Sequence, residues 1–166
     1  HALLRSLPDP VLDIGCGPGR IVSALAAAGR PALGVDPSPA AAVEAAGRGA
    51  AVLCRSVFDR LPGARRWGAA LLLDGNVGIG GDPEALLVRV RELLRPGGHA
   101  VVEVAPPGTS TSTETVRVET EGLVGPWFPW AVVGADSIPG LMAAAGLVHV
   151  GNDVGDNRWF ARGVRP

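Results

Sequence analysis

The sequence has no lysine and no tyrosine, and its 166 residues include only two cysteines and seven aromatic side chains. Cys16 and Cys54 do not have the spacing of metal ligands, and Cys16 lies inside a glycine-rich turn. We therefore expect neither a metal site nor a structural disulfide. This use of cysteine fits a reducing compartment and predicts a cytoplasmic protein.

Neither sign of charge is in excess, and no long hydrophobic run is present. The chain has 15 arginines and 16 acidic residues, and the resulting net charge of −1 gives no general attraction for nucleic acid. The apolar runs are short and interrupted by glycine, so we expect no membrane span. The segment His1–Pro10 is too short and too polar for a secretory signal. The sequence gives no indication of the oligomeric state.

What remains is the composition of a packed α/β protein. Hydrophobic residues make up 47% of the chain and charged residues 19%, which excludes a disordered or fibrous chain. A chain of this length folds most simply as one domain that buries about 70% of its unfolded surface. The sequence therefore predicts a single domain over residues 1–166.

The most informative stretch is a short apolar segment that runs into a glycine-rich turn. Val11–Ile14 is apolar except for Asp13 and predicts a buried strand. Glycines at every second position form the turn, and apolar residues then recur at helical spacing from Ile21 to Ala28. Glycine lets the backbone approach a ligand closely, and the free N–H groups of a helix start attract an anion. This stretch predicts a cradle for a nucleotide-like or carboxylate-bearing ligand.

The spacing of the glycines distinguishes between classes of ligand. Dinucleotide sites use G-x-G-x-x-G, but Arg20 stands where the third glycine of that pattern belongs. The stretch DIGCGPG, Asp13 to Gly19, instead resembles motif I of the class I S-adenosylmethionine-dependent methyltransferases. The resemblance implies S-adenosylmethionine as cofactor and a doubly wound, mostly parallel Rossmann-like sheet. That sheet has about seven strands, helices on both faces and an antiparallel last strand.

A second acidic residue follows at a spacing that suits a ribose. Pro31–Asp36 predicts a second strand, and Asp36 lies 21 positions after Gly15. An acid at the tip of this strand can accept hydrogen bonds from both ribose hydroxyls. The alternative is that Asp36 only begins the turn Asp-Pro-Ser-Pro. Ser38 is expected to cap a helix that Gly47 ends.

The third strand is expected over Ala50–Val57, and the residues after it resemble the adenine-binding position of the family. The family pattern has Asp-Ala where this chain has Ser-Val, so the adenine is expected to meet Val57 and Phe58. Asp59 either replaces the missing carboxylate or is a solvated turn residue.

The fourth strand, Gly68–Leu73, ends in a loop rich in glycine that resembles motif IV of the family. Asp74 and Asn76 are the candidates to face the acceptor, unless the loop only reverses the chain. The loop lacks the Asn/Asp-Pro-Pro-aromatic signature of enzymes that methylate amino groups of nucleic acids, which again disfavours a nucleic-acid substrate. A capped helix from Asp82-Pro83 and a fifth strand, His99–Ala105, complete this part of the pattern.

Residues 10–105 are thus expected to form the cofactor-binding core. Residues 106–134 are expected to be an insertion on the substrate side, with an edge strand in which Val116, Val118 and Thr120 alternate with charged residues. Three aromatic residues within Pro126–Trp130 either form a wall over the active-site mouth or plug a hydrophobic sheet edge. Residues 135–166 are expected to supply a helix up to Ala145 and two strands, 147–150 and 158–164, joined by a turn-rich segment.

The resemblance also implies roles for individual residues. Asp13 is expected to orient the ammonium group of the cofactor and Arg20 to reach its carboxylate. A general base is not required by the pattern, but Asp74 or Glu103 could serve a hydroxyl acceptor. His99 is rejected as a base because it begins its strand, at the edge opposite the cofactor, and His149 meets the same objection. The residues expected to bind the cofactor are Asp13, Gly15, Cys16, Gly17, Gly19, Arg20, Asp36, Pro37, Val57, Phe58, Asp74 and Gly75, and the catalytic candidates are Asp74, Asn76 and Glu103.

The predicted activity is methyl transfer to a small molecule. One alternative is a non-catalytic methyltransferase-like module that acts through a partner, since only about ten residues precede the first strand where the family has a longer helical segment. The other is an NAD-dependent oxidoreductase, which the absent third glycine disfavours.

Overall fold

A computed structural model gives the structure of residues 6–120 and 122–166. Its main sheet contains five parallel strands, as the sequence predicts. They are β1 (Val11–Ile14), β2 (Ala32–Asp36), β3 (Val52–Cys54), β4 (Trp67–Leu72) and β5 (Leu94–Val104). The remaining two strands of this sheet are β10 (Val148–Gly155) and β11 (Arg158–Val164). The described part of His1–Pro10 begins at residue 6.

The order of the strands is β10-β11-β5-β4-β1-β2-β3. The chain runs outward from β1 to β3 and then returns to the other side of β1 with β4, so the order reverses between β1 and β4. Strand β11 is antiparallel to both of its neighbours. The predicted doubly wound sheet with an antiparallel last strand is thus confirmed. Ligands of such sheets bind at the carboxyl ends of the strands, beside the point of reversal.

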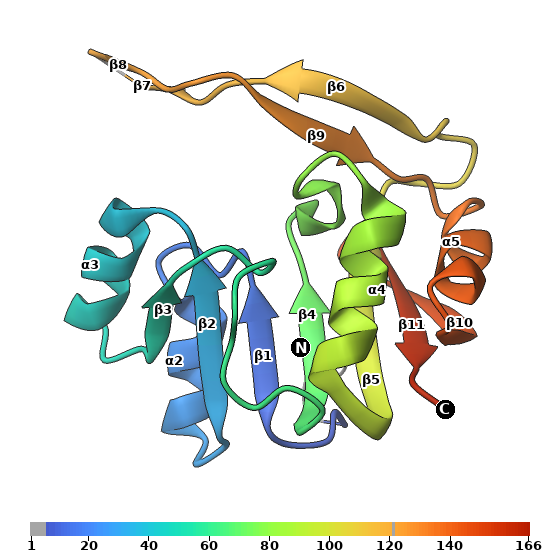
Figure 1. Cartoon of the computed structure of the whole chain (residues 1–166), viewed down its shortest axis with the longest axis horizontal. Coiled ribbons are helices and arrows are strands. Elements are labelled where there is room, and N and C mark those ends of the chain that lie inside the picture. The colour runs from blue at the N-terminus through green and yellow to red at the C-terminus, as the bar shows by residue number, and fades with distance from the viewer. Residues whose placement is uncertain (1–5, 121) are drawn as a thin grey trace.

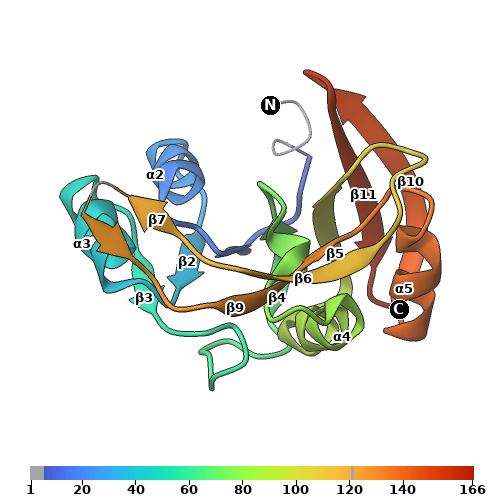
Figure 2. The same ribbon diagram turned by 90° about the horizontal axis from the view of Figure 1, so that it is seen from above.

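Helices cover both faces of the sheet (Figures 1 and 2). On one face lie α2 (Arg20–Ala27) and α3 (Pro39–Gly47); on the other lie α4 (Pro83–Leu93) and α5 (Ile138–Ala144). The 3-10 helix η1 (Asn76–Gly78) follows β4. Among the described residues, no helix is both long enough and apolar enough to cross a membrane.

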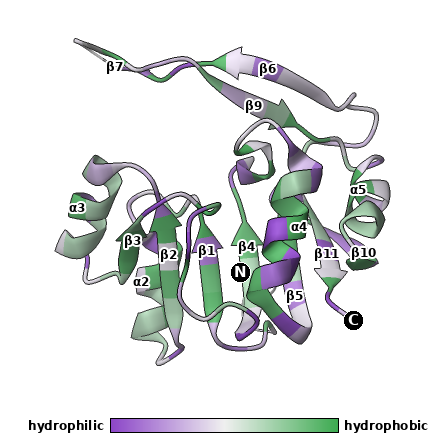
Figure 3. Cartoon of the chain, in the orientation of Figure 1, coloured by the Kyte–Doolittle hydropathy of each residue, from purple (hydrophilic) through white to green (hydrophobic). Residues whose placement is uncertain are grey.

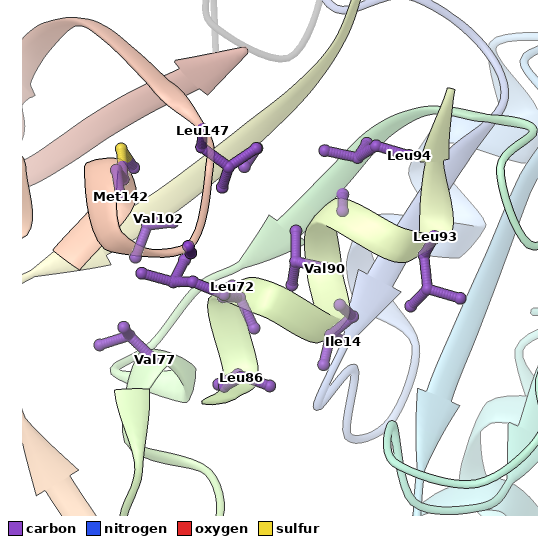
Figure 4. Close-up of a cluster of buried hydrophobic side chains, with 14 of the residues drawn as sticks. Ile14, Leu72, Val77, Leu86, Val90, Leu93, Leu94, Val102, Met142 and Leu147 are labelled. Carbon is purple, nitrogen blue, oxygen red and sulfur yellow. The ribbon is translucent and has the colours of Figure 1, made fainter. Parts of the chain in front are cut away.

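The largest hydrophobic cluster lies between the sheet and α4 and α5. Figure 4 shows Leu72 and Val102 of the sheet beside Val90 of α4 and Met142 of α5. All four side chains are fully buried. Figure 3 shows β1, β2 and β3 of the main sheet mostly green, whereas β6 (Ser112–Val116) is pale or purple along much of its length. The apolar pattern of the strands therefore builds the core, and the region around β6 lies outside it.

The helix starts follow the predicted capping residues. The Ser38 and Asp82 side chains accept hydrogen bonds from the backbone N–H groups of Ala41 and Ala85, at 3.3 and 3.0 Å. The end of α3 differs from the prediction, because Gly47 is its last helical residue. The left-handed residue that follows the helix is Gly49, with φ of 69°.

Two strands differ in length from the prediction. Strand β3 stops at Cys54 because Ser56 and Asp59 form a turn, in which the N–H of Ser56 donates to Asp59 Oδ2 at 3.0 Å. Strand β5 begins at Leu94, earlier than expected, because Leu94 already pairs with Trp67 before an irregularity in the ladder. The predicted turn at Pro96-Gly97-Gly98 is thus part of an irregular strand start.

The closing hairpin is longer than predicted. The turn-rich segment 151–157 mostly continues β10, whose register shifts between His149 and Gly151. Asp156 and Asn157 form the whole turn, with φ of 51° and 58°. Positive φ at both central residues is the geometry of a tight type I′ hairpin, in which Asp and Asn are well tolerated. This hairpin brings Arg158 to the carboxyl end of β5.

The segment after β5 forms a separate two-stranded ribbon instead of an edge strand of the main sheet. Strand β6 pairs with β9 (Phe128–Val132), and β7 (Glu119–Thr120) pairs with β8 (Leu123–Val124). The expected continuous strand through Val118 is wrong, because Val118 lies between β6 and β7; Glu121 lies outside the described residues. The ribbon crosses the carboxyl ends of the parallel strands (Figures 1 and 2). Pro129 is tolerated because β9 lies in a two-stranded sheet with β6, where one side of the strand has no continuous ladder to which an N–H would have to donate.

Replacing Arg165 by methionine is expected to lower the free energy of unfolding by about 2 kcal/mol. The buried Arg165 guanidinium donates to the carbonyls of Arg91 and Leu94, at 2.8 and 2.7 Å, and so satisfies groups that the end of α4 leaves free. Urea unfolding measures this loss. Arg95→Met, an exposed arginine nearby, is the control and should change stability by less than about 0.5 kcal/mol. Equal losses in the two variants would contradict this account of Arg165.

Candidate functional site

The loops after β1 and β4 meet across the point where the strand order reverses. The side-chain amide of Asn76 donates to the carbonyls of Ile14 and Gly15, at 2.9 and 2.8 Å. A Cβ atom at Gly15 would lie 2.5 Å from Asn76 Nδ2, so only glycine fits there. The catalytic candidate Asn76 therefore fixes the glycine turn against the loop after β4 through its amide nitrogen.

The turn after β1 is also tied to the tip of β2. Asp36 Oδ2 accepts a hydrogen bond from the N–H of Gly17 at 2.9 Å, and its Oδ1 accepts from Ser38 at 2.9 Å. The next residue, Pro37, accepts a weak contact at 3.6 Å from the Cys54 thiol. Asp36 thus faces the glycine turn, as the expected ribose site requires, and in this structure it also stabilises the turn.

The three glycines of the turn have different surroundings, although each has a positive φ. A Cβ atom at Gly17 would meet nothing within 4 Å, so the space beside this glycine is open. A Cβ atom at Gly19 would lie 2.7 Å from that of Ala50, which shows that Gly19 allows α2 to pack closely against the segment after α3. Of the two, only Gly17 borders space that a ligand can fill.

Cys16, within the turn, has its thiol directed toward β2. A Cβ atom at Gly34 would lie 2.4 Å from Cys16 Sγ. Burial, with the nearby carboxylates of Asp13 and Asp36, raises the pKa of the Cys16 thiol to about 12. The thiol is therefore protonated at neutral pH and has the character of a packing group, not of a nucleophile.

Asp13 is a buried carboxyl in the centre of the sheet. Its exposed fraction is 3%, and it makes no hydrogen bond through its carboxyl group within residues 6–120 and 122–166. Burial and, to a lesser extent, the charge of Asp74 raise its pKa to about 7, although Arg20 acts in the opposite direction. A buried carboxyl in this environment would be stabilised in its charged form by a cationic ligand group beside it.

Asp13→Asn is expected to stabilise the protein by about 2 kcal/mol at pH 8 and to have almost no effect at pH 4. The folded protein keeps the Asp13 proton up to about pH 7, whereas the unfolded chain loses it near 3.8. Stability of the wild type therefore falls between pH 4 and 7, by at most roughly 4 kcal/mol from this group. Urea unfolding of both proteins at pH 4, 6 and 8 measures the difference. A gain that is the same at all three values would contradict the raised pKa.

The residues after β3 form a loop that an arginine of α4 holds. Arg89 donates to the carbonyls of Val57 and Asp59, at 3.0 and 2.7 Å. Val57 is buried, whereas the Phe58 side chain is 47% exposed. Asp59 uses its carboxylate within the turn to Ser56. The expected adenine residues thus lie at the carboxyl edge, and Arg89, which the sequence did not reveal, fixes their backbone.

A network of charges joins the ends of β4, β5 and β11. Glu103 accepts a hydrogen bond from Arg158 Nε at 2.7 Å, and a second one from a terminal nitrogen of the same guanidinium. Asp74 contacts Arg158 at 2.6 Å and Arg20 at 3.5 Å, and its own N–H donates to Glu103 at 2.6 Å. Burial alone would raise the pKa of Glu103, but the bonds from Arg158 and Asp74 hold it below its usual range.

A cavity of about 240 Å³ lies between this network and the ribbon. Gly75 and Val77 of the loop after β4 line it, with Glu103 at the end of β5 and Trp130 of β9. The Trp130 ring makes an edge-to-face contact with Phe128, at a centroid distance of 6.0 Å. Trp130 thus lines a cavity at the carboxyl ends of the strands, whereas Trp127 of the same cluster is exposed. His149 is the second residue of β10, at the far end from these carboxyl ends. The expectation that His99 begins its strand is wrong, because β5 starts at Leu94 and His99 lies in its middle, five residues before Val104.

Comparisons with known proteins agree with this geometry. Residues 1–150 match a family model described as a methyltransferase domain. A search of curated proteins gives no significant match. Among solved structures, an S-adenosylmethionine-dependent methyltransferase from Bacteroides fragilis, in complex with S-adenosylhomocysteine, superimposes with a TM-score of 0.80. It is 19% identical, and the alignment covers 99% of this chain and 76% of the other.

Two further solved structures share the fold. One is the 1,6-didemethyltoxoflavin N1-methyltransferase of Burkholderia thailandensis, with a TM-score of 0.72, 21% identity, and 99% of this chain and 74% of that one covered. The other is a sugar N-methyltransferase from Streptoalloteichus, with a TM-score of 0.68, 22% identity and coverages of 93% and 79%. The likeness to these structures establishes a shared fold, and the match over residues 1–150 establishes that the chain belongs to the family of methyltransferase domains.

Proposed function

We propose that the chain transfers a methyl group from S-adenosylmethionine to a small-molecule acceptor. The observation that carries the proposal is the hydrogen bond from the N–H of Gly17 to the Asp36 carboxylate. It shows that this carboxylate lies beside an open glycine turn, at the point where the strand order reverses. This arrangement fits an adenosyl ligand in two respects. The carboxylate can accept from ribose hydroxyls, and the open space beside Gly17 admits a ligand against the backbone.

The same edge offers groups for the rest of the cofactor. The buried carboxyl of Asp13 suits the ammonium group of the methionine part, and exposed Arg20 suits its carboxylate. The Phe58 side chain and the backbone of Val57, whose carbonyl accepts a hydrogen bond from Arg89, are proposed to contact the adenine. Cys16, Pro37, Asp74 and Gly75 border the same turn and loop, and are proposed to contribute backbone contacts.

When bound, the cofactor supplies an already activated methyl group, so the protein mainly has to orient the acceptor and exclude water. Such positioning is worth about 7–11 kcal/mol. We assign the cavity beside Gly75 to the acceptor, and we assign residues 106–134, which include Trp130, to the substrate side. Glu103 already accepts three hydrogen bonds and has a lowered pKa, so we propose a positioning role for it rather than that of a general base.

The proteins of similar fold guide the choice of acceptor to test. Two of them carry the names of a toxoflavin-precursor N1-methyltransferase and a sugar N-methyltransferase. Amine-bearing small molecules are therefore the first acceptors to examine. Both cysteines are free, which supports the proposal of a reducing, cytoplasmic location.

Binding and transfer test the function in two steps. S-adenosylhomocysteine should raise the melting temperature, because a ligand at 100 times its Kd adds about 2.7 kcal/mol of stability, whereas NAD should not. Transfer from methyl-labelled S-adenosylmethionine to a panel of amines and alcohols is then followed by mass spectrometry. No binding would overturn the cofactor assignment, and binding without transfer to any acceptor would favour a non-catalytic module.

A further inference from the structure

Arg158 is the first residue of β11 and follows the tight turn at Asp156-Asn157 directly. Its strand runs antiparallel to β5, with Phe160 opposite Glu103, so the hairpin delivers the arginine to the carboxyl end of β5. The guanidinium lies over the Phe160 ring, 5.4 Å from its centroid. Neither motif of the cofactor site contains this residue, and it stands 84 positions from Asp74 in the chain.

The contacts of Arg158 join two acidic residues that would otherwise repel each other. Through Nε and a terminal nitrogen it binds both oxygens of Glu103, the side chain of which is only 15% exposed. The same terminal nitrogen reaches Asp74 Oδ1 at 2.6 Å. A guanidinium that binds one carboxylate through two nitrogens fixes the orientation of the two side chains as well as their distance. A lysine ammonium group cannot do this.

The loop after β4 depends on this arrangement. Asp74 has φ of 54° and Gly75 has φ of 79°, so two successive residues are left-handed and the first is not glycine. Such a conformation persists only where its surroundings hold it. Here the Asp74 side chain is held by Arg158, and its N–H by Glu103. The next residue, Asn76, clamps the glycine turn.

We propose that Arg158 is a positioning residue that fixes the loop of residues 74–78, and with it the wall between the cofactor turn and the acceptor cavity. Gly75 and Val77 of this loop line that cavity together with Glu103. Arg158 acts through Asp74 and Glu103, and its own side chain need not touch either ligand. The benefit to methyl transfer rests on the proposed function, whereas the effect on the loop does not.

The test uses Arg158→Gln and Arg158→Lys, with Arg162→Gln as a matched control. Arg162 lies on the same strand, is similarly exposed, and pairs with Asp153 outside the site. In Arg158→Gln we expect amide hydrogen exchange over residues 74–78 to become at least tenfold faster. The pKa of the Glu103 carboxyl, followed by NMR, should rise, because the effect of burial would remain while the hydrogen bonds and the charge of Arg158 would be gone. In Arg158→Lys, which keeps the positive charge but not the two-nitrogen geometry, the pKa of Glu103 should be closer to its wild-type value than the exchange rate of residues 74–78 is.

Once an acceptor is known, kcat should fall at least tenfold in Arg158→Gln and should stay near the wild-type value in Arg162→Gln. Exchange over residues 74–78 at the wild-type rate would overturn the proposal, and so would equal acceleration in Arg162→Gln. Failure of the wild type to bind S-adenosylhomocysteine would refute the proposed function instead, because the exchange and titration results do not involve that ligand.

Discussion

Replacing Asp36 by alanine is expected to lower the affinity for S-adenosylhomocysteine by about 100-fold or more. The carboxylate stands at the tip of β2, facing the glycine turn, and it is proposed to accept hydrogen bonds from both ribose hydroxyls. A hydrogen bond to a charged group contributes about 1.5–3 kcal/mol, so the loss of two corresponds to at least about 3 kcal/mol. Isothermal titration calorimetry measures the change.

Asp36 also receives the N–H groups of Gly17 and Ser38, so its removal affects the apo protein too. Unfolding measurements on the same variant separate this loss from the loss of binding. Glu44→Ala serves as the charge control, because Glu44 is an exposed acid on the neighbouring helix α3, paired with Arg48. If both variants bind equally well, Asp36 does not hold the ribose and the assignment of the turn fails.

The second large effect is expected for Gly17→Ala, which should weaken S-adenosylhomocysteine binding by about 100-fold. A Cβ atom there meets no protein atom within 4 Å, so the methyl group projects into open space beside the turn. If the ligand occupies this space, the added methyl group overpacks the site, at a cost of up to about 3 kcal/mol. Gly15 is less suitable for this experiment, because a side chain there would first collide with Asn76.

Gly29→Ala is a close control for Gly17→Ala. Gly29 is also left-handed, with φ of 73°, also has no protein atom near its missing Cβ, and lies beyond the far end of α2. Forcing alanine into this backbone conformation costs about 1–2 kcal/mol of stability at either position. Both variants should therefore lose similar stability, and only Gly17→Ala should lose affinity. A similar loss of affinity in both would show that strain, not contact with the ligand, is the cause.

Much of the proposed cofactor site at the carboxyl edge of the sheet was predictable, because the sequence features that indicate it are local. The apolar segment before the glycine turn, the spacing to Asp36 and the capping residues Ser38 and Asp82 each lie within a few residues of the structure that they specify. In a parallel sheet the carboxyl ends of the strands share one edge. The residues that follow several strands therefore come together there once the strand pattern is right.

The ribbon was predictable only in part. The alternation around Val116 indicated a strand, but it did not reveal the partner, and pairing with β9 sets where β6 begins and ends. The aromatic cluster allowed two interpretations from the sequence, and only the tertiary structure places Trp130 beside Gly75 and Glu103. Strand pairing across more than ten residues depends on turns that the sequence does not fully specify.

The sequence by itself determined the order of strands and helices in the main sheet, the glycine turn, and the acid at the tip of β2, because each depends on neighbours along the chain. Only the tertiary structure decided that Arg158 reaches Glu103 and Asp74, that Arg89 holds the loop after β3, and that Asn76 clamps the turn. These contacts join residues at least 30 positions apart, as in the bond from Arg89 to Asp59. The raised pKa of Asp13 has the same origin, because burial and distant charges exist only after the sheet has closed around it.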